Sequence, residues 1–183
     1  MNLVRAGESD LVVRHVLDSI AVVPLLDRLR PNQNDGSLLD VGSGAGFPGV
    51  PLAIAKPEAK VVLLDRSSRR CSFLTTVRLL LDLGNIEVVE GDAATYEGRH
   101  THIACRAFAP FDRAIPMLRR LLLPGGVILY LSASNAKPDT PEEWSDINVT
   151  SHRLDVPFLD AERSVVIVSD LSAGEPVDNS SRD

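Results

Sequence analysis

Three glycines at alternate positions, directly after an apolar run, constrain the fold of this chain more than any other feature. Residues 38–50 read Leu-Leu-Asp-Val-Gly-Ser-Gly-Ala-Gly-Phe-Pro-Gly-Val. Glycine reaches positive φ readily and lets a ligand approach the backbone closely, so such a turn favours a bound molecule. Pro48 suits the first turn of a helix, where its missing N–H costs nothing. A strand, a glycine turn and a helix in this order predict the nucleotide-binding start of a doubly wound α/β fold.

Two acidic residues bear on the identity of the nucleotide. The glycines fit both the G-x-G-x-x-G pattern of dinucleotide-binding proteins and a G-x-G-x-G pattern. Asp65 ends the next apolar run, where its carboxylate would accept hydrogen bonds from a ribose diol of either cofactor. Asp40 lies two residues before the first glycine, which resembles the first motif of methyltransferases that use S-adenosylmethionine (SAM). We therefore expect SAM in the turn, with a nicotinamide dinucleotide as the alternative.

The pattern of apolar and polar residues predicts five strand–helix units followed by a hairpin. Strands are expected to end at 41 and to occupy 60–65, 86–90, 101–105, 127–131, 148–156 and 164–169, and helices are expected at 11–29, up to 55, at 67–83 and at 111–123. Pro24 is expected to kink the first helix, and Pro124-Gly125-Gly126 to end the last one. The last two strands have no helical stretch between them, so we expect them to pair antiparallel.

This order of elements predicts an α/β fold. It is a doubly wound, mostly parallel sheet of the Rossmann-like, SAM-dependent methyltransferase type with a C-terminal antiparallel strand. We expect one methyltransferase domain over residues 1–170, with residues 1–30 as a helical segment packed on it. Residues 171–183 are polar, and we expect a disordered tail there.

The composition excludes several classes of protein. The 183 residues carry 19 basic and 25 acidic side chains, a formal net charge of −6, which argues against a broad, non-specific nucleic-acid binder. Arginine supplies 16 of the basic side chains, and its planar fork binds phosphate, so a small basic patch stays open. The chain has no apolar run long enough to span a membrane and no signal-peptide pattern, so we expect a cytoplasmic protein. Cys71 and Cys105 lack metal or redox spacing, and we expect reduced core thiols and no metal.

Ligands of a doubly wound sheet bind beyond the carboxyl ends of its strands. The stretches expected at that edge are Asp40–Gly49, Asp65, Gly91-Asp92-Ala93, Arg106-Ala107-Phe108 and Ser132. In many methyltransferases an acidic residue after the third strand meets the adenine amino group. Asp92 is therefore a candidate for that contact, with a solvated loop aspartate as the alternative.

The sequence offers no arrangement of residues for nucleophilic or metal-assisted catalysis. Cys105 is not followed by the motif of cytosine-C5 methyltransferases, and Arg106–Pro110 differs from the Asn/Asp-Pro-Pro-aromatic motif of exocyclic-amine methyltransferases. What remains is a transfer that needs little acid–base chemistry. Guanine N7 fits because it has an in-plane lone pair and no proton to remove, and catalysis then consists mostly of positioning.

Several segments resemble one family, the bacterial methyltransferases of guanine N7 in small-subunit ribosomal RNA, also called glucose-inhibited division protein B. They are Arg14–Ser19 (Arg-His-Val-Leu-Asp-Ser), Leu39–Pro51 with its Gly-Phe-Pro-Gly, Leu63–Asp65, Arg106–Ala109, and Val156-Pro157 through Glu162-Arg163. The combination of His-x-x-Asp-Ser with Gly-Phe-Pro-Gly is quite specific. The resemblance covers roughly residues 2–169.

The resemblance implies a SAM-dependent methyltransferase whose partner is small-subunit ribosomal RNA or the ribosomal particle. The residues it assigns to SAM are Asp40, Gly42, Ser43, Gly44, Gly46, Phe47, Asp65, Arg66, Asp92, Ala93 and Arg106. The residues it places at the active site or facing RNA are Asn2, His15, Asp18, Arg106 and Arg163. We further expect a monomer, and we expect Arg106 and Arg163 to contact RNA without holding the fold.

Three features depart from the family pattern. The family carries a helical segment upstream of the position of Asn2, Asp92-Ala93-Ala94 stands where members have Arg-x-Glu, and Ser132 stands where Leu-Lys-Gly places a lysine. The last change removes a basic side chain from the edge expected to face RNA. Two other functions therefore stay open, which are SAM-dependent methylation of a small molecule and SAM binding without turnover.

Overall fold

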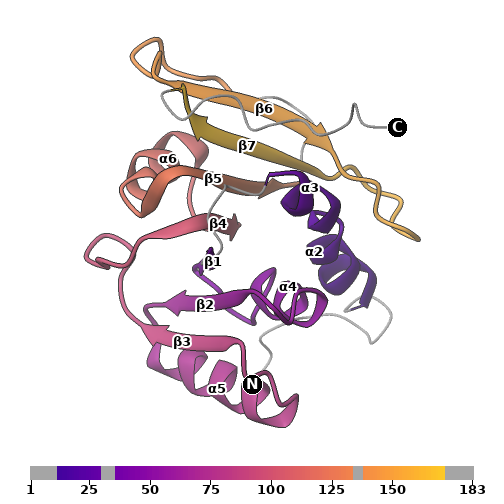
Figure 1. Cartoon of the computed structure of the whole chain (residues 1–183). Helices are drawn as coiled ribbons and strands as arrows, with labels where there is room; N and C mark the ends of the chain where they lie inside the picture. The colour runs from indigo at the N-terminus through magenta and orange to yellow at the C-terminus, as the bar shows by residue number, and fades with distance from the viewer. Residues whose placement is uncertain (1–11, 30–35, 134–137, 172–183) are drawn as a thin grey trace.

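Seven strands form one sheet in the part of the chain that the computed structural model describes, residues 12–29, 36–133 and 138–171 (Figure 1). The strands are β1 (Ser37–Val41), β2 (Lys60–Asp65), β3 (Ile86–Glu90), β4 (His100–Arg106), β5 (Leu122–Ser132), β6 (Ile147–Arg153) and β7 (Ser164–Asp170). Their order is β3-β2-β1-β4-β5-β7-β6, and β7 runs antiparallel to both of its neighbours. This confirms the predicted α/β fold. The order reverses between β1 and β4, which is where ligands bind in such sheets.

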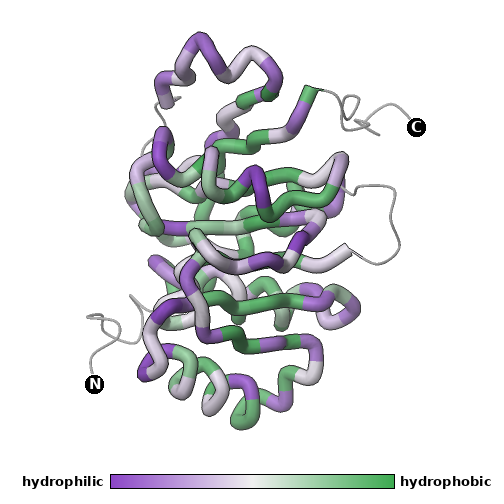
Figure 2. The backbone as a smooth tube through the Cα atoms, turned by 90° about the vertical axis from the view of Figure 1, so that its left-hand side faces the viewer, coloured by the Kyte–Doolittle hydropathy of each residue, from purple (hydrophilic) through white to green (hydrophobic). Residues whose placement is uncertain are grey.

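The helices divide between the two faces of the sheet, and each face has its own apolar core. The helical elements are η1 (Val12–Leu17, π-helical), α2 (Asp18–Ile20), α3 (Val23–Arg28), α4 (Gly49–Ala55), α5 (Ser68–Leu80) and α6 (Phe111–Arg119). Side chains of α3, α4 and α5 pack into one core, and those of α6 into the other, on the opposite side of the sheet (Figure 1). Figure 2 shows the hydrophobic stretches running along the central strands. Within the described ranges, no helix has the length and apolar character to cross a membrane.

The prediction of one continuous helix over 11–29 is wrong. The structure has a π-helical turn, η1, then the short α2, and a break at Ala21 and Val22 before α3 begins. Pro24 takes one of the first two positions of α3. Proline lacks the N–H that a helix interior needs, so it begins a new helix where we expected only a kink.

The predicted end of the last helix is also wrong. The helix α6 ends at Arg119, and Pro124-Gly125-Gly126 lies inside β5. Leu122 is buried and pairs with His100, so the chain is already extended there. The pairing with β4 then shifts register between His100 and His102, and Gly125 has a φ of +77°. Gly125 and Gly126 therefore lie at an irregularity in the pairing of β4 with β5, a place where glycine within a strand is expected.

The start of α4 packs tightly on the sheet, and Gly49→Ala tests this packing. A Cβ at Gly49 would stand 2.7 Å from Asp40 Oδ2 and would also meet the side chain of Leu63. We expect the free energy of unfolding to fall by about 1–3 kcal/mol, as for other overpacked cores. Gly84→Ala is the matched control, because a Cβ there has no neighbour within 4 Å. Chemical denaturation measures the effect, and equal midpoints for the two variants would contradict it.

Candidate active site at the carboxyl edge of the sheet

The glycine turn between β1 and α4 needs glycine at each alternate position. Gly42, Gly44 and Gly46 have φ values of +71°, +58° and +92°, a region that other residues enter with strain. The N–H groups of Gly42 and Ser43 donate to the carbonyl oxygen of Leu64, at 2.8 and 3.1 Å. The turn is therefore tied to the end of β2.

Asp40 stabilises this turn through hydrogen bonds. Its side chain is fully buried, and its Oδ2 accepts a hydrogen bond from Gly49 N at 3.0 Å. Ser43 Oγ donates to the carbonyl oxygen of Asp40 at 2.9 Å. Burial raises the pKa of the Asp40 carboxyl to about 7. Its Oδ1 has no hydrogen-bond partner among the described residues. The side chain that we expected to meet the cofactor thus lies under the turn.

Asp65 joins the same turn to the start of α5. Its carboxylate is 3% exposed and accepts hydrogen bonds from Gly44 N and Ser67 N, both at 2.9 Å. Arg70 Nη1 lies 3.3 Å from its Oδ2. Asp65 therefore stands at the end of β2 in direct contact with the middle glycine of the turn.

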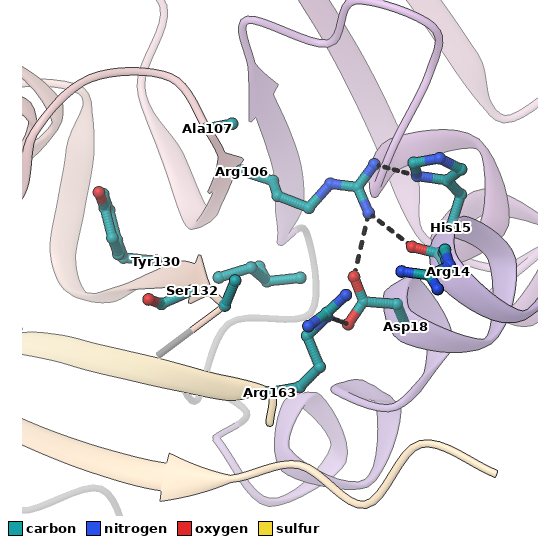
Figure 3. Close-up of a pocket in the computed structure, with 10 residues that line it drawn as sticks. Arg14, His15, Asp18, Arg106, Ala107, Tyr130, Ser132 and Arg163 are labelled. Carbon is teal, nitrogen blue, oxygen red and sulfur yellow. Dashed lines mark hydrogen bonds and ion pairs between the residues drawn. The ribbon is translucent and has the colours of Figure 1, made fainter. Parts of the chain in front are cut away.

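A pocket of about 520 Å³ opens beside the turn, over the ends of β4 and β5 (Figure 3). Its lining residues are Arg14, His15, Asp18, Arg106, Ala107, Tyr130, Leu131, Ser132, Ala133 and Arg163. Arg106 Nη1 lies 3.1 Å from Asp18 Oδ2, and Arg163 Nε lies 3.3 Å from Asp18 Oδ1. One buried carboxylate thus holds two arginines, one from β4 and one from just before β7 (Figure 3).

His15 is neutral in this arrangement. Its Nδ1 lies 2.9 Å from Arg106 Nη2 and must accept, because a guanidinium can only donate. Burial and the neighbouring charge of Arg106 both lower the pKa of His15. The imidazole therefore carries its proton on Nε2.

Phe47, at the end of the glycine turn, contacts two of these residues. Its ring stacks on the His15 ring with centroids 5.1 Å apart, and the guanidinium carbon of Arg106 lies 5.5 Å from its centroid. The turn and the pocket are therefore in direct contact through one aromatic side chain.

The remaining predicted residues lie around this edge with varied exposure. Arg66 and Asp92 are exposed, and Ala93 is buried. Asp92 Oδ1 accepts a hydrogen bond from Ala94 N at 2.8 Å. Ser132 lines the pocket, and Asn2 lies outside the described residues. Within the described ranges no group of three His, Cys, Asp or Glu side chains could hold a metal ion.

Sequence reasoning missed three residues. Arg14 and Tyr130 line the pocket, and Arg70 pairs with Asp65. Signals were present for the first two. Arg14 directly precedes His15 in the sequence. Tyr130 lies two residues before Ser132 in β5, so strand alternation puts Tyr130 and Ser132 on the same side of the sheet.

The pairing with Asp18 changes what we expect of Arg106, which we had predicted not to hold the fold. Arg106→Ala should lower the free energy of unfolding by about 1–3 kcal/mol, because it leaves the buried Asp18 without one partner. Arg113→Ala, which removes an exposed arginine of α6, is the matched control. Equal melting temperatures for both variants would restore the original expectation.

The buried Asp40 should make stability depend on pH. The pKa of Asp40 rises from 3.8 to about 7 on folding. The stability that protonated Asp40 contributes is therefore fully present below pH 3.8 and is lost as the pH rises through about 7. Asp40→Asn should therefore lose less stability than the wild type between about pH 5 and about pH 8. Urea denaturation at both values measures this, with Asp112→Asn on the surface of α6 as the control. A slope unchanged by Asp40→Asn would show that Asp40 ionises normally in the folded protein.

The sequence matches one known protein family over most of its length. The family described as "GidB: rRNA small subunit methyltransferase G" matches residues 1–166. The chain is 34% identical over 164 residues to ribosomal RNA small subunit methyltransferase G of Neisseria gonorrhoeae (strain NCCP11945), covering 88% of this chain and 76% of that protein. It is 41% identical over 120 residues to the protein of the same name from Borrelia turicatae (strain 91E135), covering 66% and 56%.

Solved structures share the fold. A SAM-dependent methyltransferase from Aquifex aeolicus superimposes with a TM-score of 0.62 at 16% identity, covering 88% of this chain and 93% of that one. Coclaurine N-methyltransferase bound to N-methylheliamine and SAH gives a TM-score of 0.56 at 17% identity, covering 74% and 50%. The family match spans most of the sequence, and the chain belongs to the GidB family of small-subunit rRNA methyltransferases.

Proposed function

We propose that this protein transfers a methyl group from SAM to the N7 atom of a guanine in small-subunit ribosomal RNA. The observation that carries the proposal is the direct contact between a glycine turn of the cofactor-binding type and a pocket lined by arginines, at the reversal of strand order. Relatives that match most of this chain are named as ribosomal RNA small subunit methyltransferases. We also infer that the protein acts in the cytoplasm as a monomer, on the RNA or on the ribosomal particle.

The turn fits a bound nucleoside. A Cβ on Gly44 would meet only the carbonyl oxygen of Gly42, at 3.7 Å, whereas Gly42 and Gly46 lie against side chains. Gly44 is thus the position where a ligand can approach the backbone. Asp65 contacts the same glycine and would accept hydrogen bonds from the ribose diol, and Asp92, after β3, is the candidate for the adenine amino group.

The pocket fits a target that needs to be positioned and not deprotonated. Bound SAM supplies an electrophilic methyl group, and guanine N7 offers a lone pair without a proton to remove. Each guanidinium has five N–H donors, so Arg106 and Arg163 can hold Asp18 and still donate to guanine O6 or to phosphate oxygens. The neutral His15 keeps Arg106 in place from the other side.

Methyl transfer from labelled SAM tests the proposal. Undermethylated small ribosomal subunits, their free RNA and a set of small molecules are offered in parallel. We expect label only in the RNA-containing samples, and 7-methylguanine after digestion. Label in a small molecule alone would favour a small-molecule methyltransferase, and SAM binding without any transfer would favour a binding protein.

The choice of SAM over a nicotinamide is tested by calorimetry. Gly44→Val should abolish SAM binding, because a side chain would fill the approach to the turn and the φ of +58° disfavours valine. Asp65→Ala should weaken binding by about 1.5–3 kcal/mol, the range for hydrogen bonds to a charged group. Gly84→Ala serves again as the control. Binding of NADH in place of SAM would overturn the assignment.

Ser132 tests the side of the pocket that should face RNA. It lines the pocket at the end of β5, where the family pattern places a lysine. Ser132→Lys should tighten RNA binding by about 0–1 kcal/mol and leave SAM affinity unchanged, because an exposed ion pair contributes little. The salt dependence should steepen by about one phosphate contact. Titrations of small-subunit RNA at two salt concentrations measure both effects, and identical curves would mean that Ser132 does not face the RNA.

A further inference from the structure

Phe47 belongs to the turn by its backbone and to the pocket by its side chain. Its neighbours Gly46 and Pro48 are both buried, and a Cβ on Gly46 would come within 2.7 Å of Val50 and 3.1 Å of Leu74. The backbone at Phe47 is therefore fixed by the packing of the turn. Its ring is half-buried and lies against His15 and Arg106.

Apart from Leu17, which packs against the apolar core, the segment that Phe47 contacts has little apolar anchorage of its own. None of the residues of η1 is buried, and Val12 is 48% exposed. The contacts that hold η1 at the pocket include the Phe47 ring on His15 and the hydrogen bonds from Arg106 to His15 Nδ1 and to the carbonyl oxygen of Arg14. Segments with few buried apolar contacts open at low free-energy cost. Undocking of η1 would carry Arg14 and His15 away from the pocket that they line.

We infer that Phe47 couples the two sites. A ligand bound at the turn against the half-buried Phe47 ring restricts that ring to the position stacked on His15, which keeps η1 docked and Arg106 aimed into the pocket. The RNA-binding form of the pocket is then more populated when the cofactor is bound, so each ligand raises the affinity of the other. Phe47 is thus a positioning residue, and the inference rests on the proposed function.

The size of the coupling can be stated in advance. Coupling between two sites typically changes affinity about 5–150-fold, and linkage requires the same factor in both directions. A single aromatic contact of this kind belongs at the lower end, so we expect about fivefold. The stacking requires an aromatic ring, and a leucine of similar apolar character cannot replace it.

The test measures the affinity for undermethylated small-subunit RNA with and without saturating S-adenosylhomocysteine, which binds without reacting. The wild type should bind RNA about fivefold more tightly with the nucleoside present. A ratio of one in the wild type would overturn the inference. Failure of the wild type to bind this RNA at all would instead overturn the proposed function.

Four variants then assign the coupling to the ring. Phe47→Leu should bring the ratio close to one, and Phe47→Tyr should keep it. Phe73→Leu, the same substitution at a partly buried residue of α5, should also keep it, which separates coupling from a general loss of packing. His15→Leu removes the partner ring and gives the same test if Phe47→Leu does not fold. A full ratio in Phe47→Leu or in His15→Leu would contradict the assignment.

Discussion

The hydrogen bond from Gly49 N to the buried carboxylate of Asp40 is the contact on which the site depends. It joins the end of β1 to the first turn of α4 across the glycine turn, and Asp65 also contacts this turn through Gly44 N. Burying a carboxylate is unfavourable unless it is hydrogen-bonded, and the raised pKa of Asp40 records that cost. The fixed backbone that results positions both Gly44, which we propose faces the cofactor, and Phe47.

The pocket proposed to face RNA has a charge opposite to that of the whole chain. The chain carries a formal charge of −6, yet the pocket is lined by Arg14, Arg106 and Arg163 against the single carboxylate of Asp18. Because Asp18 is 4% exposed and contacts two of these arginines, it fixes their direction without neutralising the pocket. In the proposed function, this local charge and not the net charge of the chain attracts the RNA.

The features that could be predicted from the sequence are those that depend on residues close together in the chain. Three positive φ values in five residues demand glycine, so the turn and its strand could be predicted from Gly42, Gly44 and Gly46. The contact between Arg106 and Asp18 joins residues 88 positions apart. The family resemblance named both residues as site residues but did not predict that they pair. The role of Pro124-Gly125-Gly126 depends on the pairing of β5 with β4, which a local helix-ending pattern does not report.

The central claim is that the cofactor turn delivers a methyl group to the arginine-lined pocket. A crystal structure with S-adenosylhomocysteine bound tests this most directly. We predict the ribose against Asp65 and the sulfur open to the pocket between Arg106 and Ser132, with Phe47 still stacked on His15. A nucleoside bound elsewhere on the sheet, or a sulfur shielded from that pocket, would contradict the account.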